Sequence, residues 1–163
     1  MQHVTFRQFL FFLLIMGGLH SNAQSGTDQK EQRIKSLIDS KKYGFIAQSA
    51  TSNKGRTVQL STGYGLNLIQ DSLQVDLPYY GRAYNSSYPA SDDVGIRFTS
   101  HDFSYLADTT KKGGWDITIK PKGARVSAIY LSVSSSGYCS VRISSNDRDP
   151  ISYYGTITDH MVH

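Results

Sequence analysis

The sequence predicts a mainly β protein, an antiparallel meander of about ten short strands that forms a barrel or a two-layer sandwich, with one N-terminal helix. Its composition includes 14 glycines and 11 tyrosines, and only 18% of its residues are charged. Such a composition is typical of strands and tight turns. From Tyr43 onward, apolar side chains recur at every second position, which is the period of a half-buried strand.

Each strand is defined by alternating apolar residues and is bounded by turn residues. The alternating runs begin at Phe45, Val58, Tyr64, Leu73, Ile96, Phe103, Trp115, Ile129, Cys139 and Ile151. Short connections between these runs favour pairing of strands that are neighbours in sequence. Alternation also means that each strand buries one face and exposes the other.

The first 23 residues resemble an export signal. Residues 9–19 are a continuous apolar run, and Ser21 and Ala23 place small residues before Gln24. This pattern predicts a secretory signal peptide cleaved before Gln24. The run is shorter than the ~20 residues that span a bilayer, so no transmembrane segment is expected after cleavage. We therefore expect a signal peptide at 1–23, a helical segment at 24–42 and an antiparallel β domain at 43–163, in a periplasmic or extracellular protein.

The helical segment is predicted at residues 27–40. Thr27 is a suitable N-cap, and Ile34, Leu37 and Ile38 recur with the spacing of one helix face. Lys41 and Lys42 suit the C-terminal end of the helix dipole.

Charge and cysteine content exclude some classes of function. The chain has 17 basic and 13 acidic residues, and the basic residues are dispersed, so no nucleic-acid partner is expected. The single cysteine, Cys139, cannot form an intrachain disulfide and is in phase with Val141 and Ile143. It is expected to be a small buried side chain.

The densest motif is L-P-Y-Y-G-R-A-Y at 77–84, which opens a long connection at 78–94. Pro78 ends the strand, and Gly81 suits a positive φ in a turn. In a structural interpretation, Arg82 ties the connection down. Its expected partners are the ring of Tyr79 or Tyr84 and the carboxylates of Asp92 or Asp93.

The same motif also has a functional interpretation as a binding surface. Tyrosine and arginine are enriched in binding hot spots, and long loops are often functional. Here the tyrosine rings contact a sugar or peptide, and an arginine binds a carboxylate. The candidate ligand-binding residues are Tyr79, Tyr80, Arg82, Tyr84 and Tyr88.

The motif at 77–84 resembles the L-P-Y-[FY]-G-R-A hallmark of an uncharacterised family of exported bacterial proteins, domain-of-unknown-function family four-two-five-one. The resemblance covers most of the chain after the signal and includes G-I-R-F at 95–98, K-G-G-W at 112–115 and I-S-Y-Y-G at 151–155. It implies export and a compact β domain, and it supplies no catalytic residues. The charged turn at 147–149 departs from the neutral or singly basic turn expected in that family.

Catalytic and metal-binding patterns are weak in this sequence. Asp92 and Asp93 are adjacent and point apart, which is unsuited to paired acid–base chemistry. His101 and Asp102 are expected in a hairpin turn without a serine motif around them. Asp159 and His160 lie near the chain end without an identified third metal ligand. We therefore expect no enzyme, no metal and no cofactor.

Two functions remain. The preferred one is an exported, non-enzymatic β domain that binds a small amphipathic ligand, glycan or peptide through the tyrosine-rich loop or the barrel interior. The alternative is a structural or interaction protein of the cell envelope with no ligand pocket. The expected partner is accordingly a small ligand or an envelope protein.

Overall fold

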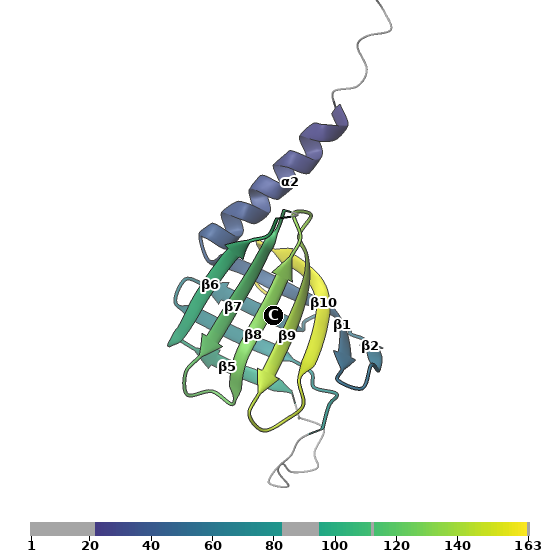
Figure 1. Cartoon of the computed structure of the whole chain (residues 1–163), viewed down its shortest axis with the longest axis vertical. Helices are drawn as coiled ribbons and strands as arrows, with labels where there is room; N and C mark the ends of the chain where they lie inside the picture. Colours follow the sequence, from purple (N-terminus) through teal and green to yellow (C-terminus); the bar gives the residue numbers. More distant parts are fainter. Residues whose placement is uncertain (1–21, 83–94, 112, 163) are drawn as a thin grey trace, which may run out of the picture.

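Ten antiparallel strands form a nearly closed barrel, and helix α2 (Asn22–Asp39) projects from one end of it (Figure 1). The computed structural model describes residues 22–82, 95–111 and 113–162. The strands are β1 (Lys42–Ser52), β2 (Thr57–Gln59), β3 (Gly65–Ile69), β4 (Ser72–Leu77), β5 (Ile96–Ser100), β6 (Phe103–Thr109), β7 (Trp115–Pro121), β8 (Val126–Val133), β9 (Tyr138–Ser145) and β10 (Ile151–Thr158). The mainly β meander is therefore confirmed, as a barrel.

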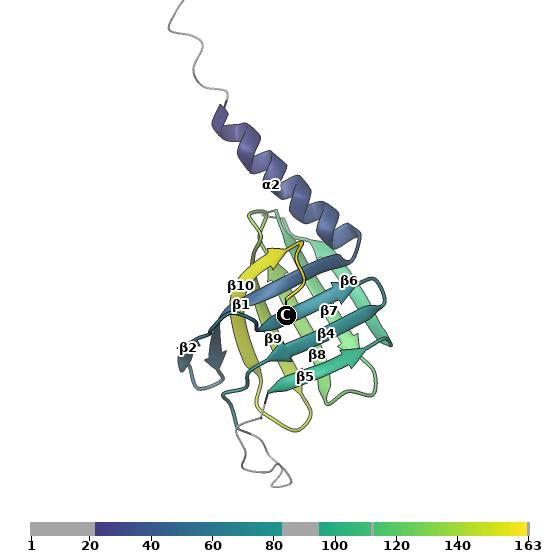
Figure 2. The same ribbon diagram turned by 180° about the vertical axis from the view of Figure 1, so that it is seen from behind.

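The strand order is β5-β4-β3-β1-β10-β9-β8-β7-β6, with β2 paired to β1. Most strands pair with their neighbours in sequence, and pairing of β1 with β10 joins the two halves of the barrel. Seen from behind, β1, β3, β4 and β5 form one wall (Figure 2). The connection at 101–102 was expected to be a hairpin turn, and this expectation is wrong. It is a corner, because β5 and β6 stand at opposite ends of the strand order.

Strand β1 bends where it passes between the two halves of the barrel. Its register with β10 shifts between Ala47 and Ser49. Glycines lie beside this stretch on both neighbouring strands. A Cβ on Gly65 would lie 1.9 Å from the carbonyl oxygen of Phe45, and one on Gly155 would lie 1.9 Å from that of Ile46. Only glycine permits such close approach of the strands.

The core is built from side chains that line up across neighbouring strands. One row contains Ile117, Leu131, Val141 and Tyr153, and the next contains Ile119, Ile129, Ile143 and Ile151. All are buried. The apolar residues that alternate in the sequence are therefore those whose side chains point into the barrel. Packing between these side chains on neighbouring strands stabilises the sheet.

Helix α2 begins at Asn22, five residues before the predicted start at Thr27. Thr27 lies inside the helix and does not cap it, because residues 22–26 contain no proline and continue the helical turn. Ile34 and Ile38 are buried against the barrel, as predicted. Lys41 lies past the last turn, where its φ of 52° ends the helix. Among the described residues, no helix has the length and apolarity to cross a membrane.

Candidate functional site

The segment that follows β4 is fastened to the barrel through Tyr79. The Tyr79 hydroxyl lies 2.9 Å from the carbonyl oxygens of Arg82 and Asp149, and its proton is shared between them. The backbone N–H of Asp149 also donates to the Arg82 carbonyl at 3.0 Å. Residues 77–82 therefore fold back around Tyr79 and contact the loop between β9 and β10. We call this segment the strap.

Pro78 provides a second attachment of the strap. The Tyr153 hydroxyl, on β10, donates to the Pro78 carbonyl at 2.7 Å. Burial raises the pKa of Tyr153 well above its ordinary value, so its hydroxyl stays protonated and available as a donor. The strap is thus bonded to both β10 and the loop that precedes it.

Arg148 is the main residue that sequence reasoning missed. Its side chain is only 6% exposed, and its guanidinium Cζ lies 4.8 Å from the centroid of the Tyr79 ring. Its Nε lies 3.4 Å from Oδ1 of Asp147, whose side chain is also largely buried. A buried arginine requires both charge compensation and contacts for its planar face, and these two neighbours supply them.

The positive φ expected at Gly81 within the strap is wrong. Gly81 is not among the residues with positive φ. Glycine is required there because a Cβ would lie 2.2 Å from the Tyr79 hydroxyl oxygen. The side chain of Arg82 is exposed, and the guanidinium that stacks on Tyr79 comes from Arg148. The other expected partners of Arg82, which are Tyr84, Asp92 and Asp93, lie outside the described residues, so those contacts stay predictions. Arg82 contributes its backbone carbonyl oxygen to the strap, as the acceptor for the Tyr79 hydroxyl and the Asp149 N–H.

Beside the strap lies a cavity of about 460 Å³. Its lining includes the start of β5, the start of β8 and the end of β9, and these strand ends lie at the end of the barrel away from α2 (Figure 1). Its lining residues are Gly95, Ile96, Arg97, Phe98, Ala124, Arg125, Val126, Ser145 and Arg148. We call it the end pocket. Ile96 and Val126 are buried, and Phe98 packs against the core, so part of its surface is apolar. The three arginines and Ser145 make the remainder polar.

The predicted ligand-binding residues divide into three groups. Tyr79 is held inside the strap and contacts Arg148, which lines the end pocket. Tyr80 is 45% exposed, and Arg82 is exposed beside it. Tyr84 and Tyr88 lie outside the described residues, as do Asp92 and Asp93. Ligand binding by these residues stays a prediction.

His101 and Asp102 do not contact one another as an acid–base pair in this geometry. His101 Nδ1 lies 3.2 Å from the carbonyl oxygen of Asp71, and the Asp102 carboxylate pairs with Lys122 at 2.8 Å. Both residues are exposed at the corner between β5 and β6. Across the described ranges, no group of three or more histidine, cysteine, aspartate or glutamate side chains is arranged to hold a metal ion.

Cys139 is buried, as predicted, and burial raises the pKa of its thiol. Nearby, the hydroxyls of Tyr43 on β1 and Tyr105 on β6 face each other inside the barrel. Both hydroxyl oxygens are buried, and neither meets the distance and angle criteria for a hydrogen bond with a described residue. Burial, and then the neighbouring Tyr105, raise the pKa of Tyr43. The Nζ of Lys41 lies 5.1 Å from the Tyr105 ring centroid. Hydroxyl groups buried inside an apolar barrel, like those of Tyr43 and Tyr105, destabilise the fold unless they form hydrogen bonds.

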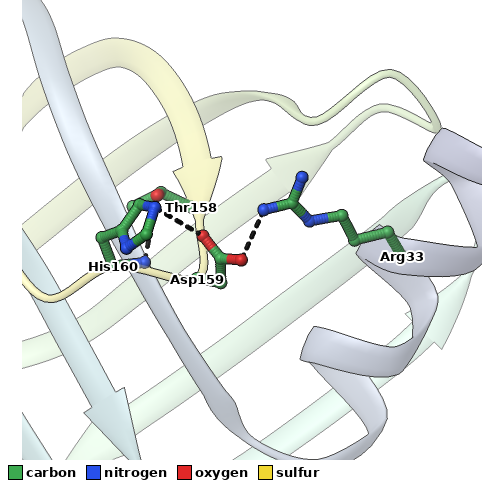
Figure 3. A network of polar contacts seen from close by, with 4 residues as sticks. All are labelled: Arg33, Thr158, Asp159 and His160. Atoms are coloured by element: carbon green, nitrogen blue, oxygen red, sulfur yellow. Dashed lines mark hydrogen bonds and ion pairs between the residues drawn. The ribbon is translucent and has the colours of Figure 1, made fainter.

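The chain end carries a small polar network that contacts the helix. Asp159 pairs with Arg33 of α2 and with His160, whose backbone N–H donates to the Thr158 hydroxyl at 3.1 Å (Figure 3). The hydrogen bond from Arg33 lowers the pKa of Asp159. Asp159 and His160 therefore form an exposed contact between helix and barrel.

Comparison with known proteins identifies the family but no activity. The fold is similar to the crystal structure of a DUF4251 family protein from Bacteroides eggerthii DSM 20697, with a TM-score of 0.62 and 16% sequence identity. The match covers 82% of this chain and 90% of that one. None of the curated proteins compared with the chain matches it. The family model "Domain of unknown function (DUF4251)" matches residues 26–157, and the chain therefore belongs to this family.

Proposed function

We propose that this chain is an exported, non-catalytic β-barrel domain that binds a small amphipathic ligand in the end pocket. The observation that carries the proposal is the composition of that pocket. Ile96, Phe98 and Val126 give it an apolar surface, while Arg97, Arg125 and Arg148 line the same cavity. A volume of about 460 Å³ is within the range of small-molecule sites.

The arginines favour a ligand that combines an apolar part with a carboxylate, sulfonate or phosphate group. Arg97 already pairs with Asp76 at 3.1 Å, and Arg148 contacts Asp147 and Tyr79. A ligand anion would therefore bind beside arginines that already contact carboxylates of the protein. Arg97 and Arg125 are both exposed, whereas Arg148 is buried, so a ligand anion can reach Arg97 and Arg125 from solvent.

Export and the lack of catalysis are parts of the same proposal. The pattern of residues 1–23 supports cleavage before Gln24, which mass spectrometry of the N-terminus tests directly. The separate partners of His101 and Asp102 support a non-catalytic protein. The tyrosine-rich residues Tyr80 and Arg82 lie on the strap, beside the pocket, and are candidate contacts for a ligand that extends out of it.

The binding test uses the amphipathic anion 1-anilinonaphthalene-8-sulfonate as a fluorescent reporter. Fatty acids, lysophospholipids, oligosaccharides and peptides then compete with it, and thermal shift provides a second readout. Arg125→Glu is expected to weaken reporter binding at least tenfold by placing a negative charge at the pocket. The matched control is Arg142→Glu, which makes the same change on the exposed face of β9.

A second comparison tests the tyrosine-rich strap. Tyr80→Ala and Arg82→Ala are compared with Tyr130→Ala, which removes a similarly exposed ring from β8. Selective loss of binding in the strap variants supports a contribution from the predicted residues. Equal effects of Arg125→Glu and Arg142→Glu, in proteins with native circular dichroism, would show that the end pocket is not the binding site.

The alternative, an interaction protein of the envelope, is supported by a different feature. Strand β6 has a regular free edge, which is suited to a partner chain. In this alternative the end pocket holds no ligand, so absence of reporter binding in the test above would favour it.

A further inference from the structure

Strand β6 ends the sheet order, and no strand in the described part of the chain pairs with its other backbone edge, called here the free edge. Thr110 N–H donates to the Gly114 carbonyl at 3.0 Å, and Lys122 N–H donates to the Asp102 carbonyl at 2.9 Å. These two bonds show that the even-numbered residues around β6 direct their backbone groups toward β7. In an antiparallel ladder, the N–H and C=O of alternate residues point to opposite sides. The odd-numbered residues, Phe103, Tyr105, Ala107 and Thr109, therefore present donors and acceptors to the free side.

This edge lacks the usual devices that prevent strand addition. The sequence F-S-Y-L-A-D-T contains no proline and no lysine, and its register with β7 is continuous from Phe103 to Thr109. Its single charge is Asp108. Leu106 is 59% exposed, more than any other large apolar side chain in the described part of the chain. Natural edge strands of this length are normally interrupted, charged or covered.

The opposite end of the strand order differs from β6 in length and charge. Strand β5 has five residues, against seven in β6. It carries Arg97, whose guanidinium pairs with Asp76 of β4 on the exposed face. A short edge with an arginine is a poor template for another strand. Strand β6 lies at the margin of the row β6 to β10, with its free side facing outward (Figure 1).

We infer that β6 pairs antiparallel with β6 of a second copy of this chain, about a two-fold axis at Leu106. In this register Tyr105 faces Ala107 of the second copy, and Phe103 faces Thr109. These are residues whose backbone groups point to the free edge, so each facing pair exchanges two hydrogen bonds. The two Leu106 residues face each other at a non-hydrogen-bonded position, where side chains approach most closely.

Side-chain charge selects this register over its neighbours. With the axis at Leu106, Asp108 lies opposite Ser104 of the second copy. Moving the axis to Tyr105 places Asp108 opposite Asp102, and like charges directly opposite each other are destabilising. Moving the axis to Ala107 places Asp108 opposite Leu106. The contact between the two Leu106 side chains is then lost. The strand is therefore complementary to itself, and this argues for a second copy as the occupant of the edge.

The first test is the molar mass of the purified chain, measured by sedimentation over a wide range of concentrations. A concentration-dependent dimer is expected. Ala107→Pro is expected to abolish it, because proline removes one outward N–H that β7 does not use. Leu106→Lys places two lysines opposite each other and is also expected to abolish it. Tyr130→Lys, on the exposed face of β8, is the matched control and is expected to remain dimeric.

The second test is the register. Native Cys139 is buried, so an introduced cysteine reports its own position. With diamide as the two-electron oxidant, Leu106→Cys is expected to form an intermolecular disulfide and Ser104→Cys is not, since Ser104 faces Asp108. A chain that is monomeric at every concentration overturns the inference. A dimer that survives both Ala107→Pro and Leu106→Lys, or that cross-links equally through Ser104→Cys, also overturns it. Neither test depends on ligand binding in the end pocket.

Discussion

The guanidinium of Arg148 lies over the ring of Tyr79, with Cζ 4.8 Å from the ring centroid. This contact joins the strap after β4 to the loop before β10. The same Tyr79 donates its hydroxyl proton to the carbonyl oxygens of that loop and of the strap itself. One side chain thus connects two segments that are far apart in sequence, beside the end pocket.

The first prediction concerns the Tyr79 hydroxyl. Tyr79→Phe is expected to lower the free energy of unfolding by ~1 kcal/mol, because two carbonyl oxygens lose a donor while the ring contact remains. Urea denaturation measures the change. Tyr80→Phe is the matched control in the same segment and is expected to change stability by less than ~0.5 kcal/mol, since that ring is exposed. Equal effects of the two substitutions would contradict the structural role of Tyr79.

The strap also shows how far sequence reasoning extends. Residues 77–82 are attached to the body of the protein, as predicted, whereas residues 83–94 of the predicted loop lie outside the described residues. The sequence predicted that Arg82 stacks on Tyr79 or Tyr84 or pairs with Asp92 or Asp93. The structure uses Arg148, which lies in a turn that the sequence suggested only as a departure from the family pattern. Choosing between two arginines requires knowledge that the loop before β10 lies beside the end of β4. That relationship depends on barrel closure, and local patterns do not contain it.

The strands were easier to predict because their signal is local. Each inward-facing row consists of alternating apolar residues, as in Ile117 and Ile119 on β7. Most of their pairing followed from short connections. The exceptions are β2 and β3, which both pair with β1, and the two-residue link at 101–102, which suggested a hairpin. In the structure this link turns a corner of the barrel. Link length alone cannot distinguish a hairpin from a corner, because both require a reversal over few residues.

The second prediction separates the two contacts that hold α2 on the barrel. Ile38 is 2% exposed, and Ile38→Ala is expected to lower the free energy of unfolding by roughly 2–4 kcal/mol through lost burial and a residual cavity. The Arg33 and Asp159 side chains are 62% and 37% exposed, so solvent screens their pairing. Arg33→Ala is therefore expected to have a much smaller effect than Ile38→Ala.

Chemical denaturation and hydrogen exchange along residues 30–40 measure this difference. Faster exchange throughout the helix is expected in Ile38→Ala, with little change in Arg33→Ala. Asp159→Asn is the companion variant on the other side of the pair, and its effect should match that of Arg33→Ala. A larger loss of protection in the two charge variants than in Ile38→Ala would show that the ion pair holds the helix.

The third prediction concerns stability at high pH. Burial raises the pKa of Tyr43, Tyr105, Tyr153 and Cys139 above their ordinary values. The unfolded chain therefore loses these protons first, at pH values near 10 for tyrosine and about 8.5 for cysteine. Their contribution to stability is fully present below those values and is lost as pH rises toward the raised pKa values of the folded state. Each group contributes up to about 1.4 kcal/mol per pH unit to this loss.

Tyr43→Phe tests the pH dependence and the buried hydroxyl together. Between pH 10 and 12, the variant is expected to lose stability less steeply than the native chain, since one ionisable group is gone. At pH 7 it is expected to be equally stable or up to ~1 kcal/mol more stable, because the Tyr43 hydroxyl is buried without a hydrogen bond to the described residues. Urea denaturation at a series of pH values measures both quantities. Ile119→Val is the control: it removes a buried methylene without removing a proton, so it should lower stability by a similar amount at every pH. An unchanged alkaline slope in Tyr43→Phe would show that this hydroxyl ionises as readily in the folded barrel as in the unfolded chain.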